Sequence, residues 1–366
     1  MRHRPLLAVL AALALLAPAA PARAAAPHQL AGVPAYWAPD AHPEEFVRLA
    51  QNVPAVELVV VNGSASRAES PFDPAWASAV STLHDAGINV LAYVDTGYLG
   101  TTGHLTRTGS TAAADWIAQA KADIDEWYQL YGPAGLDGVF LDQTVASCDQ
   151  ADAYAELSDH LSAGHPRDMV VINPGVGVGQ CYEPIADVIV SFENTWAAYQ
   201  AHVPLAWETA HPDPRKFWHL VHDAPDAAAM AAAVARSKAN NAGYVYVTDD
   251  TLHAGGFPWD SFPAYWHAEL AALAGVADTV PPDPPHGFTA SVQPGVVELS
   301  WRNPYDNVAV ADYEVVNGSV SLGTCYPNRF RVTGLAAGTT YRFKVRARDV
   351  SGNIGQYRAI TVTTPS

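Results

Sequence analysis

Two acidic residues stand directly after apolar runs of the kind that form buried strands. Asp142 follows residues 138–141, and Glu193 follows residues 188–192. At the carboxyl end of a strand in a parallel barrel or open sheet, side chains project toward the active-site region. Glycoside hydrolysis uses two carboxyl groups, one protonated and one ionised, across the scissile bond. We therefore interpret Asp142 and Glu193 as a candidate catalytic pair, with Asp95 as the reserve carboxylate.

Polar and aromatic residues follow nearly every other predicted strand as well. An acid at one strand end often only caps a turn, so the interpretation depends on this recurrence. Hydroxyl-binding polar groups together with aromatic faces suit a sugar. For His222, a structural hydrogen-bonded role is an equal alternative. The predicted substrate-binding residues are Tyr36, Trp37, Asn62, Asp95, Gln143, Asn173, Trp196, His222, Tyr246 and Asp249.

Several other chemistries lack their signatures. The sequence has no glycine-rich phosphate loop with a lysine and no Gly-x-Ser-x-Gly elbow, which argues against phosphoryl and acyl transfer. No Cys/His spacing is typical of a zinc site. We expect neither a cofactor nor a metal.

The chain is acidic, and its charge is uneven. The net charge is −17, with 32 Asp and Glu against 9 Lys and Arg in residues 25–283, and 5 against 8 beyond. An acidic chain disfavours nucleic acid and anionic membranes as partners. It suits a neutral or partly cationic polysaccharide, although ordinary solubility would explain the same charge. We expect a monomer.

Short apolar runs alternate with amphipathic stretches from residue 33 to residue 273. Eight strands with intervening helices in about 250 residues are typical of a (β/α)₈ TIM barrel. The alternative, a doubly wound open sheet, lacks a dinucleotide fingerprint after its first strand. The predicted strands cover residues 33–37, 56–61, 89–94, 138–141, 169–172, 188–192, 217–221 and 244–247.

A proline-rich linker at residues 277–285 separates this barrel, residues 25–276, from a second module at residues 286–366. The second module shows short alternating strands and no helix. Trp301 and Tyr341 resemble the core tryptophan and the tyrosine corner of a fibronectin type III sandwich. We expect this module to act as a spacer or tether.

Residues 1–24 have the features of a secretory signal peptide. Arg2 and Arg4 precede an apolar run, and Ala22-Arg23-Ala24 is a small-residue cleavage site. The run is too short and too interrupted by proline to be a membrane anchor. We therefore expect a secreted, extracellular protein. Export permits one disulfide, and Cys148 and Cys181, in loops after successive strands, are the candidate pair, which leaves Cys325 free.

The barrel resembles the spherulin-4 family, also called spherulation-specific family 4, over residues 31–273. The resemblance implies a (β/α)₈ fold and the activity of glycoside hydrolase family 135, internal cleavage of galactosaminogalactan, a polymer of galactose and N-acetylgalactosamine. The segments that carry it are Tyr36-Trp37, Ala92-Tyr93-Val94-Asp95, Asp137-Gly138-Val139-Phe140-Leu141-Asp142, Asn173-Pro174-Gly175, Ser191-Phe192-Glu193 and Tyr244-Val245-Tyr246-Val247-Thr248-Asp249-Asp250.

One position departs from the family pattern. The resemblance places catalytic acids at Asp142, at the next position and at Glu193, but the next position is Gln143. An amide neither donates a proton as an acid nor carries the charge of a base. Either Asp142 and Glu193 suffice for catalysis, or the barrel binds glycan without cleaving it. A third hypothesis is a hydrolase of another amino-sugar polymer, such as chitin or poly-glucosamine.

Overall fold

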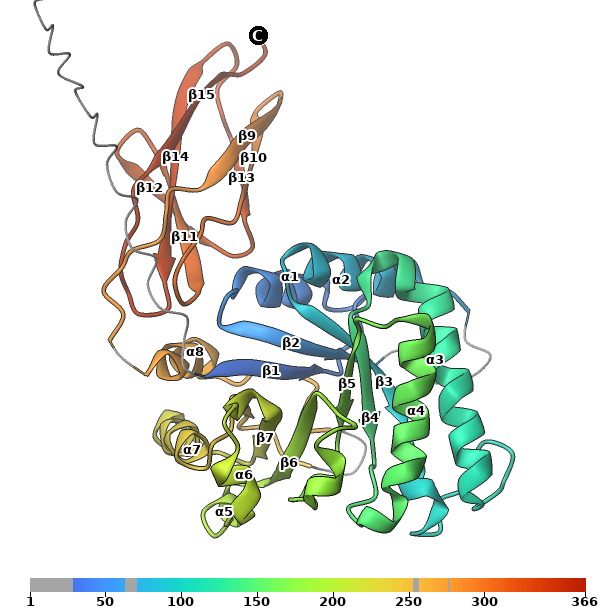
Figure 1. Ribbon diagram of the computed structural model, residues 1–366. Helices are drawn as coiled ribbons and strands as arrows, with labels where there is room; N and C mark the ends of the chain where they lie inside the picture. The colour runs from blue at the N-terminus through green and yellow to red at the C-terminus, as the bar shows by residue number, and fades with distance from the viewer. Residues whose placement is uncertain (1–28, 63–70, 253–256, 276) are drawn as a thin grey trace, which may run out of the picture.

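The computed structural model describes residues 29–62, 71–252, 257–275 and 277–366, so the predicted signal peptide lies outside the described residues. Eight parallel strands pair in sequence order, and β1 also pairs with β8, which closes the barrel. This confirms the TIM-barrel prediction against the open sheet (Figure 1). The strands are β1 (Leu30–Ala35), β2 (Val56–Val61), β3 (Asn89–Asp95), β4 (Gly138–Asp142), β5 (Met169–Ile172), β6 (Val188–Thr195), β7 (Phe217–His222) and β8 (Tyr244–Val247).

Helices surround the barrel, and several begin at sequence signals. Pro74 opens α2 after Asp73, whose side chain accepts a hydrogen bond from Ala75 N, and Asp226 caps α7 in the same manner. The main helices are α1 (Pro43–Gln51), α2 (Pro74–Asp85), α3 (Ala113–Gly135), α4 (Ala151–Gly164), α7 (Ala227–Ala239) and α8 (Trp266–Ala274). Shorter ones are η2 (Gly97–Gly100), η3 (Cys148–Gln150), η4 (Gln180–Tyr182), α5 (Trp196–Tyr199), α6 (Ala206–Ala210) and η5 (Pro214–Lys216).

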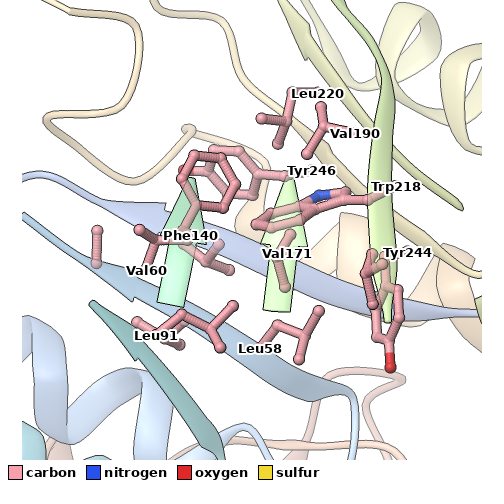
Figure 2. Close-up of a cluster of buried hydrophobic side chains, with 14 of the residues drawn as sticks. Leu58, Val60, Leu91, Phe140, Val171, Val190, Trp218, Leu220, Tyr244 and Tyr246 are labelled. Atoms are coloured by element: carbon pink, nitrogen blue, oxygen red, sulfur yellow. The ribbon is translucent and has the colours of Figure 1, made fainter. Parts of the chain in front are cut away.

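Apolar side chains fill the barrel. Trp218 lies across the interior, with Phe140 and Tyr246 in the same cluster (Figure 2). Gly32 of β1 provides the room, because a Cβ there would lie 2.7 Å from the Trp218 ring. Since the interior is packed, a binding site must lie at the rim of the barrel.

A disulfide joins two loops that follow strands of the barrel. Cys148, in η3 after β4, is bonded to Cys181, in η4 after β5, with an S–S distance of 2.07 Å. Cys325 is a free cysteine. No helix in the described ranges has both the length and the apolar character needed to cross a membrane.

The second module is a sandwich of two antiparallel sheets, with strand orders β13-β10-β9 and β12-β11-β14-β15. Trp301 is buried between them, and the Tyr341 hydroxyl accepts a hydrogen bond from Ala336 N at 2.9 Å, as in a tyrosine corner. The strands are β9 (His286–Gln293), β10 (Val296–Arg302), β11 (Val310–Asn317), β12 (Val320–Cys325), β13 (Arg329–Thr333), β14 (Thr340–Asp349) and β15 (Arg358–Thr363).

The sandwich docks against the end of the barrel where β2 begins. Val308 and Ala309, from the loop before β11, are buried in the apolar cluster of the barrel. Ala55 N donates to Val308 O at 3.2 Å, and Asn52 Nδ2 donates to Val310 O at 2.9 Å. Because these contacts lie at the amino-terminal end of β2, the sandwich leaves the carboxyl ends of the strands uncovered (Figure 1).

Candidate active site

Three neighbouring strands bring the two candidate acids to one place. Asp142 is the last residue of β4, Asn173 directly follows β5, and Glu193 lies near the carboxyl end of β6. Backbone bonds continue the sheet register into this region, because Asn173 N donates to Leu141 O at 2.9 Å and Glu193 N donates to Gly175 O at 2.9 Å. The three polar side chains therefore share the same rim of the barrel.

Asn173 links the two carboxylates. Its Nδ2 donates to Asp142 Oδ1 at 2.7 Å and to Glu193 Oε2 at 2.5 Å. Since one nitrogen lies at these two distances from both oxygens, the oxygens are at most 5.2 Å apart. The carboxyl groups are thus close enough to act on the two faces of a single sugar linkage.

The Asn173-Pro174-Gly175 segment fixes the orientation of this amide. Gly175 adopts a left-handed backbone conformation, with φ of 66°, and its N–H donates to Asn173 Oδ1 at 3.0 Å. This Asx turn uses the amide oxygen, so both hydrogens of Nδ2 face the carboxylates. The geometry explains why an Asn-Pro-Gly sequence follows β5.

Each carboxylate has a second side-chain donor. The Tyr93 hydroxyl donates to Asp142 Oδ2 at 2.8 Å, and Trp259 Nε1 donates to Glu193 Oε1 at 3.3 Å. Trp127 Nε1 in turn donates to the carbonyl oxygen of Tyr93 at 2.8 Å, which anchors the strand behind the hydroxyl. All four carboxylate oxygens are therefore hydrogen-bonded, and the acids are held in position.

Burial raises the pKa of both acids. The pKa of Glu193 rises to about 7, first because of burial and then because of the charge of Asp142, and hydrogen bonds from Asn173 and Trp259 oppose this rise. Burial also raises the pKa of Asp142, opposed by hydrogen bonds that include those from Tyr93 and Asn173. We assign the first ionisation to Asp142, whose charge then keeps a proton on Glu193.

The backbone of the site includes conformations that L-residues rarely adopt. Of the five described non-glycine residues with positive φ, Tyr98, Gln143 and Asp223 line the groove described below. Each left-handed residue costs roughly 1 kcal/mol. Tyr98 N donates to Gln143 O at 2.8 Å, which ties two of these residues together. Such clustering of strained backbone is typical of functional sites.

The acids open into a groove of about 720 Å³ at the carboxyl ends of the strands. Seven predicted site residues line it, namely Tyr36, Asn62, Asp142, Gln143, Asn173, Glu193 and His222. The further lining residues are Tyr93, Tyr98, Pro174, Gly175, Val176, Asn194, Thr195, Leu220, Asp223, Leu252, Phe257 and Trp259. None of these described lining residues is a lysine or an arginine, so the groove is acidic.

Three predicted aromatic residues do not line the groove. Trp37 is 4% exposed and packs against Phe46 and Phe262. Tyr246 is fully buried inside the barrel (Figure 2). Trp196 opens α5 and packs against the apolar core from outside. Their aromatic rings serve packing in this structure.

Two predicted acids have other partners near the rim. Asp95 Oδ1 accepts a hydrogen bond from Gly97 N at 2.8 Å, although the residue pairs in register with Asp142. Asp249 accepts from Ala264 N at 3.3 Å. Neither side chain lines the groove. His222 does line it, and burial lowers its pKa, so the ring is a neutral hydrogen-bonding group there.

The prediction missed Tyr93 and Trp259 as groove residues. Tyr93 lies within β3, where successive side chains point to opposite faces of the strand, and the sequence does not say which face lines the groove. Trp259 comes from the loop between β8 and α8, and only the folded loop brings its indole to Glu193. Within the described residues, the sole three-ligand cluster suited to a metal lies at the sandwich, away from this groove.

The closed parallel barrel with linked carboxylates at its strand ends, followed by an antiparallel sandwich, defines a two-module TIM-barrel protein. The family described as spherulation-specific family 4 matches residues 32–273, and the fibronectin type III domain matches residues 283–364. The chain therefore belongs to spherulation-specific family 4 and carries a fibronectin type III domain. Both resemblances noted in the sequence are confirmed.

Individual relatives match the chain over different lengths. Spherulin-4 of Physarum polycephalum is 26% identical over 248 residues, which cover 66% of this chain and 69% of that protein. Chitinase Chi52 of Paenibacillus xylanexedens is 40% identical over 107 residues, 28% of this chain and only 20% of that protein. The crystal structure of Aspergillus clavatus Sph3 in complex with GalNAc aligns with a TM-score of 0.53 at 22% identity, covering 68% of this chain and 98% of that one. This last likeness concerns the fold.

Proposed function

We propose that the protein is a secreted, endo-acting glycoside hydrolase that cleaves a polymer containing galactosamine or N-acetylgalactosamine. The observation that carries the proposal is the pair Asp142 and Glu193, held by one amide within 5.2 Å at the floor of an open groove. A glycosidase requires such a pair, one member ionised and the other protonated. The disulfide between Cys148 and Cys181 supports an extracellular location.

The environments of the two acids suggest their roles. Asp142 is the nucleophile in our proposal, because three hydrogen bonds favour its ionised form, whereas Glu193 accepts two and its pKa is also raised by the charge of Asp142. Glu193 is the acid, because its pKa of about 7 keeps much of it protonated at neutral pH. Asp142 attacks the anomeric carbon while the proton of Glu193 passes to the leaving oxygen. Glu193 then accepts a proton from water, which attacks the same carbon and releases Asp142.

The spacing of the acids predicts the stereochemical outcome. Retaining glycosidases separate their carboxyl groups by roughly 5 Å, whereas inverting enzymes leave about 6.5–9.5 Å for a water molecule. The limit of 5.2 Å between Asp142 Oδ1 and Glu193 Oε2 supports retention. Proton NMR of the first products should show the same anomeric configuration as the substrate. Products of inverted configuration would exclude Asp142 as the nucleophile.

The groove suits an amino-sugar polymer. Leu252, Phe257 and Val176 line it and are 68%, 60% and 52% exposed, so they offer apolar contacts to sugar faces. The acidic lining favours neutral or cationic residues such as galactosamine. The structure of Sph3 with GalNAc, a relative in fold, supports a galactosamine-type substrate. The resemblance to glycoside hydrolase family 135 supports internal cleavage.

A glycan-binding protein without hydrolytic activity is the second candidate, and Gln143 is the observation that favours it. The residue lines the groove where the family pattern has an acid. Incubation with galactosaminogalactan, polygalactosamine, chitin and poly-glucosamine, followed by mass spectrometry of the products, separates the two candidates. We expect new reducing ends from a galactosamine-containing polymer. Binding without any release would support the second candidate, and release from chitin alone would change the substrate.

A further inference from the structure

Three carboxylates from separate segments meet where the linker reaches the sandwich. Asp278 follows α8, Asp306 lies in the loop between β10 and β11, and Asp349 ends β14. One oxygen atom from each residue lies within 4.8 Å of the other two. Asp306 and Asp349 are buried, with exposed fractions of 3% and 2%. Three negative groups are thus brought together with little access to solvent.

Buried oxygens of this cluster have no hydrogen-bond partner. Asp306 Oδ2 accepts from Val308 N at 2.9 Å, but Asp306 Oδ1 is buried without a partner, and so is Asp278 Oδ2. Asp349 accepts only from uncharged N–H groups, including the amide of Asn353. In the described ranges, none of the three acids takes part in a salt bridge. Buried carboxylates are normally paired with a cation or bound to a metal.

We propose that Asp278, Asp306 and Asp349 bind one Ca²⁺ ion at this junction. Ca²⁺ takes six to eight oxygen ligands at about 2.3–2.6 Å, including carboxylates and backbone carbonyls. Three oxygens at the 4.8 Å limit would lie about 2.8 Å from a common centre, so an inward shift of about 0.2 Å would bring all three within contact distance of a single ion. Mg²⁺ is smaller and demands contacts of about 2.0–2.1 Å, and Zn²⁺ prefers nitrogen and sulfur. The all-oxygen set therefore points to Ca²⁺.

The ion would stabilise the docking of the sandwich on the barrel. Asp306 lies two residues before Val308, which together with Ala309 is buried in the apolar cluster of the barrel. Asp278 belongs to the linker, and Asn353 Nδ2 donates to its carbonyl oxygen at 3.0 Å. One Ca²⁺ thus joins the linker, the docking loop and the end of β14. Because these elements are distant from the groove, this role is independent of the proposed hydrolysis.

Calorimetry on the full chain tests the site directly. After dialysis against EDTA and then buffer, titration with CaCl₂ should give one binding event per chain with a Kd of about 10⁻⁴ M, as in other extracellular modules. In 10 mM CaCl₂, the Tm should rise by at least about 5 °C. MgCl₂ at the same concentration should give a clearly smaller shift. An equal shift with MgCl₂ would indicate general ionic screening and overturn the proposal.

Three variants make the test specific. Asp306→Asn and Asp349→Asn should each abolish both the binding heat and the Ca²⁺-dependent rise in Tm. Glu298→Gln is the matched control, because it removes an exposed acid of the same module that is 3.8 Å from Arg331. This control should bind Ca²⁺ as the unmodified chain does. No binding by the unmodified chain, or unchanged binding by Asp306→Asn, would overturn the assignment.

Discussion

Glu193 and Glu208 show how differently one barrel can use two glutamates with similar proton affinity. Burial is the first cause of the raised pKa of both residues, and both values are about 7. Glu208 lies within α6, is 1% exposed, and its Oε2 accepts from Leu205 N at 3.0 Å. Glu193 opens to the groove and shares the amide of Asn173 with a second acid.

The comparison shows that a raised pKa does not by itself identify a catalytic acid. Glu208 stabilises the start of a short helix and has no second carboxylate beside it in the described structure. Glu193 has a carboxylate partner, a shared donor and access to a substrate-sized groove. Chemistry at a sugar linkage requires the second carboxylate and access to substrate, and the shared donor holds the two acids in position.

Removing either groove acid should have the largest effect. We expect Asp142→Asn and Glu193→Gln each to lower kcat by about 10³-fold, because a nucleophile or a proton donor is lost. Both variants should fold, since amides of the same shape retain most of the hydrogen bonds. Reducing-end assays on galactosaminogalactan and thermal melts measure the two effects.

Glu208→Gln is the control for this pair. It should keep kcat within about twofold and raise the Tm above pH 7, because the unmodified Glu208 loses stabilisation as the pH rises through its folded pKa of about 7. The glutamine stays neutral throughout that range. Equal losses of activity in Glu208→Gln and Glu193→Gln would show that Glu193 has no catalytic role beyond that of a buried structural glutamate.

Loss of the shared amide should have the next largest effect. Asn173→Ala removes one donor from each acid, and a hydrogen bond to a charged group contributes about 1.5–3 kcal/mol. We expect kcat to fall about 100-fold. The pKa of Asp142 should rise, so the acid limb of the pH profile should move to higher pH. A lower Tm with an unchanged pH profile would restrict Asn173 to a structural role.

The pH dependence should report the raised pKa of Glu193. Above pH 7, kcat/KM should fall about tenfold per pH unit, because the proton donor is lost as the pH passes about 7. At low pH, activity should fall as Asp142 gains a proton. Initial rates between pH 4 and pH 9 in buffers of constant ionic strength measure both limbs. Activity that keeps rising to pH 9 would mean that Glu193 does not act as the acid.

Much of the barrel could be predicted because its strands are short, apolar and separated by amphipathic helices. The bounds predicted for the strands at residues 56–61, 169–172 and 244–247 agree with the structure. In the sandwich, β9 and β12 have only a weak apolar pattern in the sequence, because their alternating residues are only partly buried. The apolar pattern that predicts a strand is therefore clear only where the strand is buried.

The residues that line the groove were harder to predict, because the register of each strand decides which of its side chains point toward the groove. Adjacent residues of an extended segment point to opposite faces, so Tyr36 can line the groove only if Trp37 turns into the core. The apolar sequence around both residues does not decide between them. Trp259 could not be predicted, since its position depends on how a long loop folds back over the rim. Acids at strand ends were the stronger signal, because a charge there cannot be buried without partners.

The smallest effect should come from the residue that departs from the family pattern. Gln143 lines the groove in a left-handed conformation, with φ of 54°, and its Oε1 is buried without a hydrogen-bond partner. Gln143→Glu keeps the shape and restores the family acid, so we expect activity equal to that of the unmodified chain or a few fold higher. The matched Gln143→Ala separates a role of the amide from a role of the charge. If Gln143→Glu lost activity more than tenfold, a third carboxylate would disturb the pair. The neutral amide of Gln143 would then be needed so that Asp142 loses its proton before Glu193 does.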